Sequence, residues 1–241
     1  MKRRYQAAVA AVAFILFLTG CSKNSGLGGK VVDVKGTPIA GVKVVANQVQ
    51  PVKGYERSET ITGSDGSFSL PKLFPASAYV LTTYTDGNIR SVSITSKSGP
   101  EGLTAILPEP ISIRFIVSKD GITVRDTKTG LMWAQNANAA GRVMNWSEAL
   151  SWVKGSNIGG FRDWRMPVKE ELETLAMAGG KRPAEWFNIN GMSNVQAGLY
   201  WSSTPYPNYT GYAWCVNMYG GYVYGYNKAS NVYVWPVRTG K

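Results

Sequence analysis

The feature that most restricts the fold is a series of short apolar and β-branched runs, separated by turn residues, between residues 29 and 94. Val42, Val44 and Ala46 alternate with outward positions, and the turn at residues 63–66 precedes another alternating run. Alternation with a period of two predicts strands that are buried on one face. Many short strands with frequent turns are typical of a β-sandwich, so we expect an all-β N-terminal region.

Three of these stretches, residues 29–32, 38–44 and 62–68, together resemble the carboxypeptidase regulatory-like domain family. The resemblance implies a small transthyretin-like or immunoglobulin-like β-sandwich over residues 29–97. It also implies a spacer without catalytic residues.

The second half of the chain has a different pattern. Residues 98–114 contain Gly-Pro and Pro-Glu-Pro breaks and predict a linker before a second domain at residues 115–241. Residues 145–153 predict a helix with Ser147 as its cap, and residues 164–175 predict an entry loop followed by a second helix. Beyond residue 179 the helix signal is weak.

The N-terminus has the pattern of an export signal. A basic start and an uncharged apolar run, residues 7–18, precede Cys21, and the run is shorter than the ~20 residues of a membrane span. The sequence Leu-Thr-Gly-Cys resembles the lipobox of bacterial lipoproteins. The resemblance implies a signal peptide at residues 1–20, palmitate-type lipidation of Cys21 and, given Ser22, the outer membrane. Residues 21–28 are then a flexible tether; the alternative is an ordinary secreted protein.

Composition excludes several kinds of chemistry. The chain has no histidine and only two cysteines, so Ser-His-Asp and Cys-His catalysis are excluded for this chain alone, as is an intramolecular disulfide framework once Cys21 carries lipid. The net charge of +11 would suit nucleic acid, but the export signal argues against that partner. We expect no enzyme activity, no cofactor and no metal site.

Aromatic residues accumulate near the C-terminus. Residues 200–241 hold nine of the 13 tyrosines, and no acidic residue follows Glu185. The residues expected in the core are Trp201, Trp214, Val216, Val223, Val234 and Val237. So many tyrosines cannot all be buried with satisfied hydroxyls, so we expect some to form an exposed interaction site.

Five motifs occur in order in the second half: residues 129–133, 146–150, 161–167, 200–203 and 235–238. They resemble the C-terminal domain family of the Legionella collagen-like adhesin. The resemblance implies a C-type-lectin-like fold, and hence an α+β protein overall. It also implies surface adhesion, with sulfated glycans among the possible ligands.

Four stretches of the C-terminal tract, residues 201–203, 213–217, 220–223 and 233–238, also resemble the variable region of proteins that are diversified by retroelements. In that resemblance a fixed frame carries randomised positions rich in Tyr, Asn, Ser and Gly. The expected binding residues for a protein or glycan ligand are Tyr206, Asn208, Tyr209, Tyr212, Cys215, Tyr219, Tyr222, Tyr224, Tyr226, Ser230, Asn231 and Trp235. An undiversified glycan adhesin, a cell-envelope enzyme and a purely structural scaffold stay open as alternatives.

Overall fold

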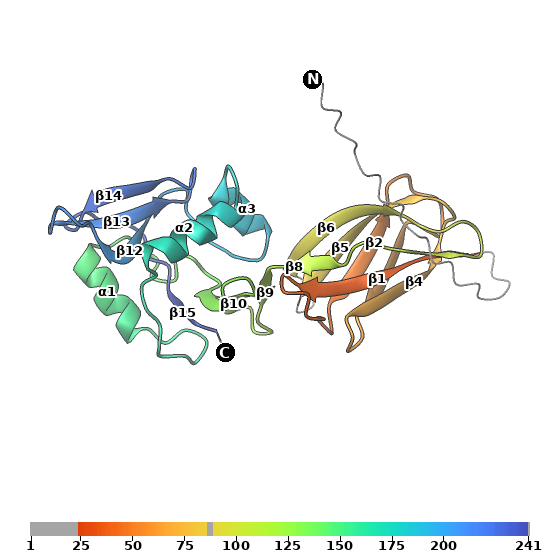
Figure 1. Cartoon of the computed structure of the whole chain (residues 1–241), viewed down its shortest axis with the longest axis horizontal. Helices are drawn as coiled ribbons and strands as arrows, with labels where there is room; N and C mark the ends of the chain where they lie inside the picture. Colours follow the sequence, from red (N-terminus) through yellow and green to blue (C-terminus); the bar gives the residue numbers. More distant parts are fainter. Residues whose placement is uncertain (1–23, 86–88, 241) are drawn as a thin grey trace, which may run out of the picture.

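The computed structural model describes residues 24–85 and 89–240, which form two β-rich lobes that lie end to end in Figure 1. The expected signal peptide and the expected lipidation residue Cys21 lie outside the described residues. Of the helices within these ranges, none is long and apolar enough to cross a membrane.

The N-terminal lobe consists of two four-stranded sheets. One has the order β4-β1-β7, with β8 pairing the second half of β1, and the other has the order β3-β2-β5-β6. The strands are β1 (Ser25–Asp33), β2 (Lys43–Gln48), β3 (Arg57–Ile61), β4 (Ser67–Leu73), β5 (Ala78–Thr85), β6 (Ile89–Lys97), β7 (Thr104–Ile106) and β8 (Ile111–Ile113).

Apolar side chains from both sheets form the core of this lobe. Val42, Val44 and Ala46 are buried together with Leu27 of β1 and Leu70 of β4. This confirms the alternation predicted around β2, and it makes the lobe a sandwich of two sheets with the apolar faces turned inward.

Two segments that were expected to be flexible contribute strands. Residues 25–28 of the expected tether are the start of β1, where Leu27 is fully buried. The expected linker, residues 98–114, contains β7 and β8, which both run parallel to β1. Short apolar runs between prolines give no clear period, so the sequence pattern could not show that they complete a sheet.

A single residue, Arg114, separates the strands of the two lobes. β8 ends at Ile113 and β9 (Phe115–Val117) follows at once. Phe115 belongs to the core of the C-terminal lobe, whereas Ile116 packs against the core of the N-terminal lobe. The Arg114 guanidinium forms two hydrogen bonds, of 2.8 and 2.7 Å, with the Asp126 carboxylate, and this fixes the junction to the second lobe.

The C-terminal lobe contains two sheets and three short helices. One sheet has the order β15-β11-β10-β9 and the other the order β12-β13-β14. Its further elements are β10 (Thr123–Asp126), β11 (Leu131–Ala134), α1 (Trp146–Gly155), α2 (Lys169–Ala178), α3 (Pro183–Ile189), β12 (Leu199–Pro205), β13 (Tyr212–Asn217), β14 (Val223–Asn227) and β15 (Val237–Thr239).

Both predicted helices form, with different starts. Asn145, not Ser147, caps α1: its side chain accepts from the Glu148 N–H, and the Glu148 carboxylate accepts from the Asn145 N–H. In α2, Leu172 and Leu175 are buried as expected. The sequence analysis missed α3, because seven residues beginning at a proline are too few for a helical period.

The expected fold class is wrong. We expected an α+β protein with a C-type-lectin-like C-terminal domain, but the described chain is mostly β, with strands in four sheets and only three short helices. The expectation followed from the family resemblance, whereas α1 and α2 are two ten-residue helices and minor parts of the lobe.

Candidate ligand-binding surface

The tryptophans of the sequence motifs hold the C-terminal lobe together. Four of the five donate the indole N–H to a main-chain carbonyl elsewhere in the lobe, so each of these rings is buried or half-buried and also bonded to another segment, whereas the buried Trp133 N–H has no partner among the described residues. The bonds run from Trp146 to Ser202 (2.9 Å), Trp164 to Ile158 (3.1 Å), Trp201 to Met144 (2.9 Å) and Trp235 to Ala134 (2.8 Å).

The arginines of the motifs also have structural roles. Arg238 binds the Asp163 carboxylate through two bonds, of 2.7 and 3.0 Å, and its guanidinium lies 3.9 Å from the centre of the Phe161 ring. This cation–π contact and the paired bonds join β15 to the loop before α2. The motifs therefore specify a rigid frame rather than a reactive centre.

At the start of α2, Arg165 binds Glu171 through bonds of 2.7 and 2.6 Å. Burial of Glu171 acts to raise the pKa of its carboxyl, but hydrogen bonds from Arg165 and from the Val168 N–H outweigh burial, and the pKa lies below its usual value. Glu171 is therefore ionised at neutral pH, and its carboxylate accepts a hydrogen bond from the Val168 N–H at the start of the helix.

Two of the expected binding residues are in the core. Cys215 and Trp235 are both fully buried. Trp235 packs against the rings of Trp133, Phe187 and Tyr200, and burial raises the pKa of the Cys215 thiol. A ligand at the surface cannot reach either side chain, so we remove both from the candidate surface.

Three tyrosines form a cup over the strand β14. The ring centroids of Tyr206 and Tyr209 are 6.0 Å apart, and those of Tyr209 and Tyr212 are 5.9 Å apart. Together with Gly225 these tyrosines line a hollow of about 380 Å³. Tyr206 also stacks on Trp214, with centroids 4.5 Å apart. We call this hollow the tyrosine cup; the exposed Asn208 lies in the loop beside it.

The other tyrosines lie in two further places. Tyr224 and Tyr226 of β14 are 45% and 39% exposed, and Tyr226 is in ring contact with Trp201. Tyr219 and Tyr222, in the turn between β13 and β14, are 62% and 64% exposed. Ser230, half-buried, and Asn231, exposed, follow β14.

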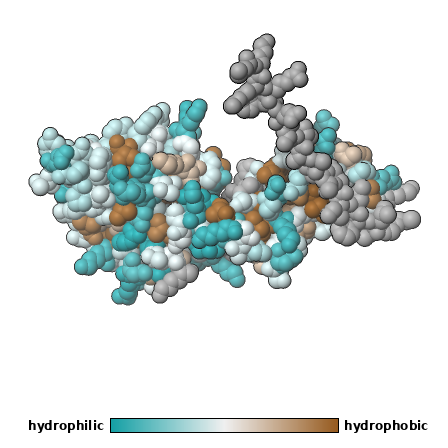
Figure 2. All heavy atoms as spheres, viewed as in Figure 1, coloured by the Kyte–Doolittle hydropathy of each residue, from teal (hydrophilic) through white to brown (hydrophobic). Residues whose placement is uncertain are grey.

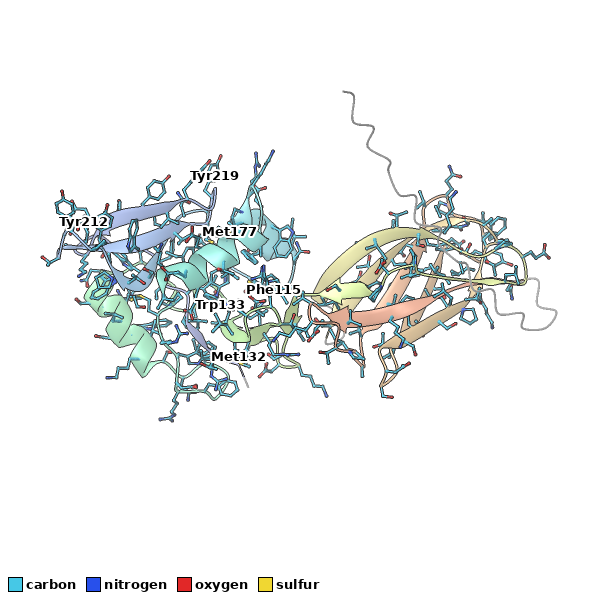
Figure 3. All side chains as sticks on the ribbon, in the orientation of Figure 1. Phe115, Met132, Trp133, Met177, Tyr212 and Tyr219 are labelled. Carbon is cyan, nitrogen blue, oxygen red and sulfur yellow. The ribbon has the colours of Figure 1, made fainter. Side chains whose placement is uncertain are left out.

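The expected single aromatic face is thus divided. Side chains alternate across a strand, so Tyr224 and Tyr226 lie on the opposite face of β14 from Gly225 and the cup. Tyr212 and Tyr219 lie at opposite ends of β13, as Figure 3 shows. In Figure 2 this part of the lobe is mainly pale to hydrophilic, because tyrosine, glycine and asparagine dominate it.

Basic residues flank the cup, and the sequence analysis missed them. The Lys169 ammonium lies 5.4 Å from the Trp214 ring centroid and also contacts Glu170 and Glu173. The Lys228 ammonium donates to the Thr210 carbonyl (2.7 Å) and lies 4.5 Å from the Trp146 ring centroid. The carboxylates of Glu170 and Glu173 offset the charge of Lys169, although no acidic residue follows Glu185 in the sequence.

The described residues contain no group of three or more Asp, Glu, Cys or His side chains placed to hold a metal ion. Three aspartates of this lobe have protein partners: Asp120 accepts from Ser118, Asp126 binds Arg114 and Asp163 binds Arg238.

Comparison with solved structures gives only weak similarities. A dioxygenase domain from Streptomyces sp. SirexAA-E is 18% identical, with a TM-score of 0.27, over 40% of this chain and 84% of that one. The 3-chlorocatechol 1,2-dioxygenase of Rhodococcus opacus 1CP is 17% identical, with a TM-score of 0.25, over 41% and 56%. The Yersinia pseudotuberculosis adhesin InvE is 12% identical, with a TM-score of 0.34, over 83% and 60%. These scores are too low to support any argument.

No curated protein matches the chain. A family match covers most of the C-terminal lobe and includes the motif residues that build its frame. Residues 122–238 match the model of the family described as the Lcl C-terminal domain, which confirms the resemblance to the C-terminal domain family of the Legionella collagen-like adhesin.

Proposed function

We propose that the protein is displayed at the bacterial cell surface and binds a protein or glycan ligand through the tyrosine-rich surface of its C-terminal lobe. One observation carries this proposal: Tyr209, Tyr219 and Tyr222 are each more than 60% exposed on a lobe whose motif residues form a tightly bonded frame. Tyrosine offers a large, rigid contact area with little side-chain entropy to lose.

The match to the Lcl C-terminal domain family further supports a role in adhesion. A cell-envelope enzyme has no such support, because the tyrosine cup is lined by three tyrosines and a glycine, with no carboxylate among its lining residues. We therefore do not propose an activity.

Anchoring through lipid on Cys21 is part of the proposal, with the outer membrane as the location. Three residues lie between Cys21 and Ser25, the first residue of β1, so the four Cα-to-Cα steps from Cys21 to Ser25 span at most about 14 Å. The N-terminal sandwich, which resembles the carboxypeptidase regulatory-like family, would then serve as the spacer between membrane and binding lobe. Labelling with radioactive palmitate tests the anchor: label is expected in the wild type and not in Cys21→Ser, and label in neither would contradict it.

Binding is tested with the purified chain on glycan and protein arrays, followed by substitution of exposed tyrosines. Tyr222→Ala with Tyr224→Ala is expected to weaken any bound array ligand by about tenfold or more, as hot-spot tyrosines do, with little change in melting temperature. Tyr84→Ala, in the other lobe, is the matched control. Loss of folding in the double variant, or an unchanged affinity, would count against the proposal.

Diversification by a retroelement is a further part of the proposal. The expected binding residues are exposed or half-buried, except Cys215 and Trp235, while Trp201 and Val237 of the frame are buried. Sequencing the neighbouring DNA tests this idea. A near-copy of the 3′ end beside a reverse-transcriptase gene, differing mainly at adenines, is expected. Without it, the undiversified adhesin of sulfated glycans is the better account.

A further inference from the structure

The strand β14 forms an unpaired edge of its sheet. In the order β12-β13-β14 it has a neighbour on one side only, and its register with β13 runs without a bulge from Val223 to Asn227. It contains no proline and no charged residue, which are the usual protections of an edge strand. Only its short length limits association with another chain.

The free hydrogen-bonding groups of this edge can be assigned from the ladder. The Asn217 N–H donates to the Tyr222 carbonyl and the Lys228 N–H donates to the Gly211 carbonyl, both at 2.8 Å. Bonded and non-bonded pairs alternate in an antiparallel ladder, so Tyr224 and Tyr226 point their main-chain groups at β13. Val223 and Gly225 direct theirs outward, and no turn or side-chain bond in the described chain reaches them.

The tyrosine cup lies beside this edge. Gly225 contributes to its lining, and a Cβ atom there would lie 2.4 Å from the ring of Tyr206, so the cup depends on glycine at this position. A residue directly opposite Gly225 on an added strand has its side chain on the same face as Gly225, the face that carries the cup.

We propose that β14 binds an extended segment of a partner polypeptide by strand addition, with one bulky apolar or aromatic side chain placed in the tyrosine cup. Main-chain bonds to Val223 and Gly225 supply affinity, and the cup selects the side chain. This inference rests on the proposed function, since it names the partner of the same surface.

A polypeptide fits this edge better than a glycan. Outward donors and acceptors repeat along β14 at every second residue, about 7 Å apart, which is the repeat of another β-strand. A saccharide chain has no matching series of alternating N–H and C=O groups.

The test uses the purified mature chain and a phage-displayed library of random linear peptides. Enriched peptides are expected to share one bulky apolar or aromatic position. Val223→Pro removes an outward N–H without touching the ladder with β13, and Val223→Ala controls for the lost side chain. We expect a roughly threefold to tenfold weaker affinity for Val223→Pro than for Val223→Ala, the effect of one main-chain bond.

Two readouts keep the test decisive if Val223→Pro does not fold. Gly225→Ala is expected to abolish the preference for a bulky residue, because Tyr206 must move. In the wild type, peptide binding should slow hydrogen exchange of the Val223 and Gly225 amides. Failure to enrich any peptide, or binding with unchanged exchange at both amides, would overturn the inference. If no peptide binds but a glycan binds and depends on the exposed tyrosines, the proposed function is retained and only strand addition is excluded. If no ligand binds, both the proposed function and the inference are contradicted.

Discussion

At the scale of single residues, burial separates side chains that the sequence presents as equivalent. Cys215 and Tyr224 lie directly opposite each other on β13 and β14, yet Cys215 is fully buried and Tyr224 is 45% exposed. Cys215 lies on the central strand β13 and points into the core, whereas Tyr224 lies on the edge strand β14 and its ring is partly in solvent. Residue type alone cannot show this difference, because both are common in binding loops and in cores.

Burial makes a prediction for the Cys215 thiol. The burial that raises its pKa disfavours the thiolate, which is the reactive form, and also denies access to reagents. Iodoacetamide at mildly alkaline pH should leave the Cys215 peptide unmodified in the native protein and alkylate it after guanidinium denaturation, as read by peptide mass spectrometry. Rapid alkylation of the native protein would show that Cys215 reaches the surface and belongs with the binding residues after all.

At the scale of elements, the sequence predicts those strands and helices whose apolar period is long enough to read. The alternation around β2 and the apolar face of α2 are examples. It does not predict β7 and β8, because three-residue strands are defined by pairing with a distant β1. The candidate surface is predicted only in part. The sequence shows that tyrosines accumulate there, but their division between two faces of β14 and a turn depends on the strand register, which the sequence does not show.

The first turn of α2 gives a pH prediction. The pKa of Glu171 in the folded protein is lowered from its usual 4.5. Its ion pair with Arg165 therefore stabilises the folded state fully above pH 4.5, and this stabilisation is lost as the pH falls through the folded pKa. Urea unfolding of wild type and Glu171→Gln should therefore show a stability difference at pH 7 that shrinks at pH 3. A constant difference would mean that Glu171 acts through packing rather than charge.

At the scale of the whole molecule, the two lobes are joined directly, without a flexible linker between β8 and β9. Arg114 is the one residue between β8 and β9, and neighbouring side chains, Phe115 and Ile116, belong to different cores. A surface on the C-terminal lobe is therefore held at a fixed orientation to the N-terminal sandwich (Figure 1). For a displayed protein, this keeps the binding surface at the end away from the N-terminal lobe.

The junction predicts resistance to proteolysis. Arg114 has a trypsin-sensitive side chain, but its carbonyl accepts from the Thr127 N–H and its guanidinium is bound by Asp126. Cleavage requires local unfolding around Arg114, which these two contacts oppose. Limited trypsin digestion should therefore leave the two lobes on one fragment, and insertion of a short Gly-Ser segment after Arg114 should release them as separate stable pieces. Rapid cutting of the wild type at Arg114 would instead indicate the flexible linker that the Gly-Pro and Pro-Glu-Pro breaks of residues 98–114 predict, and the two lobes would then move independently.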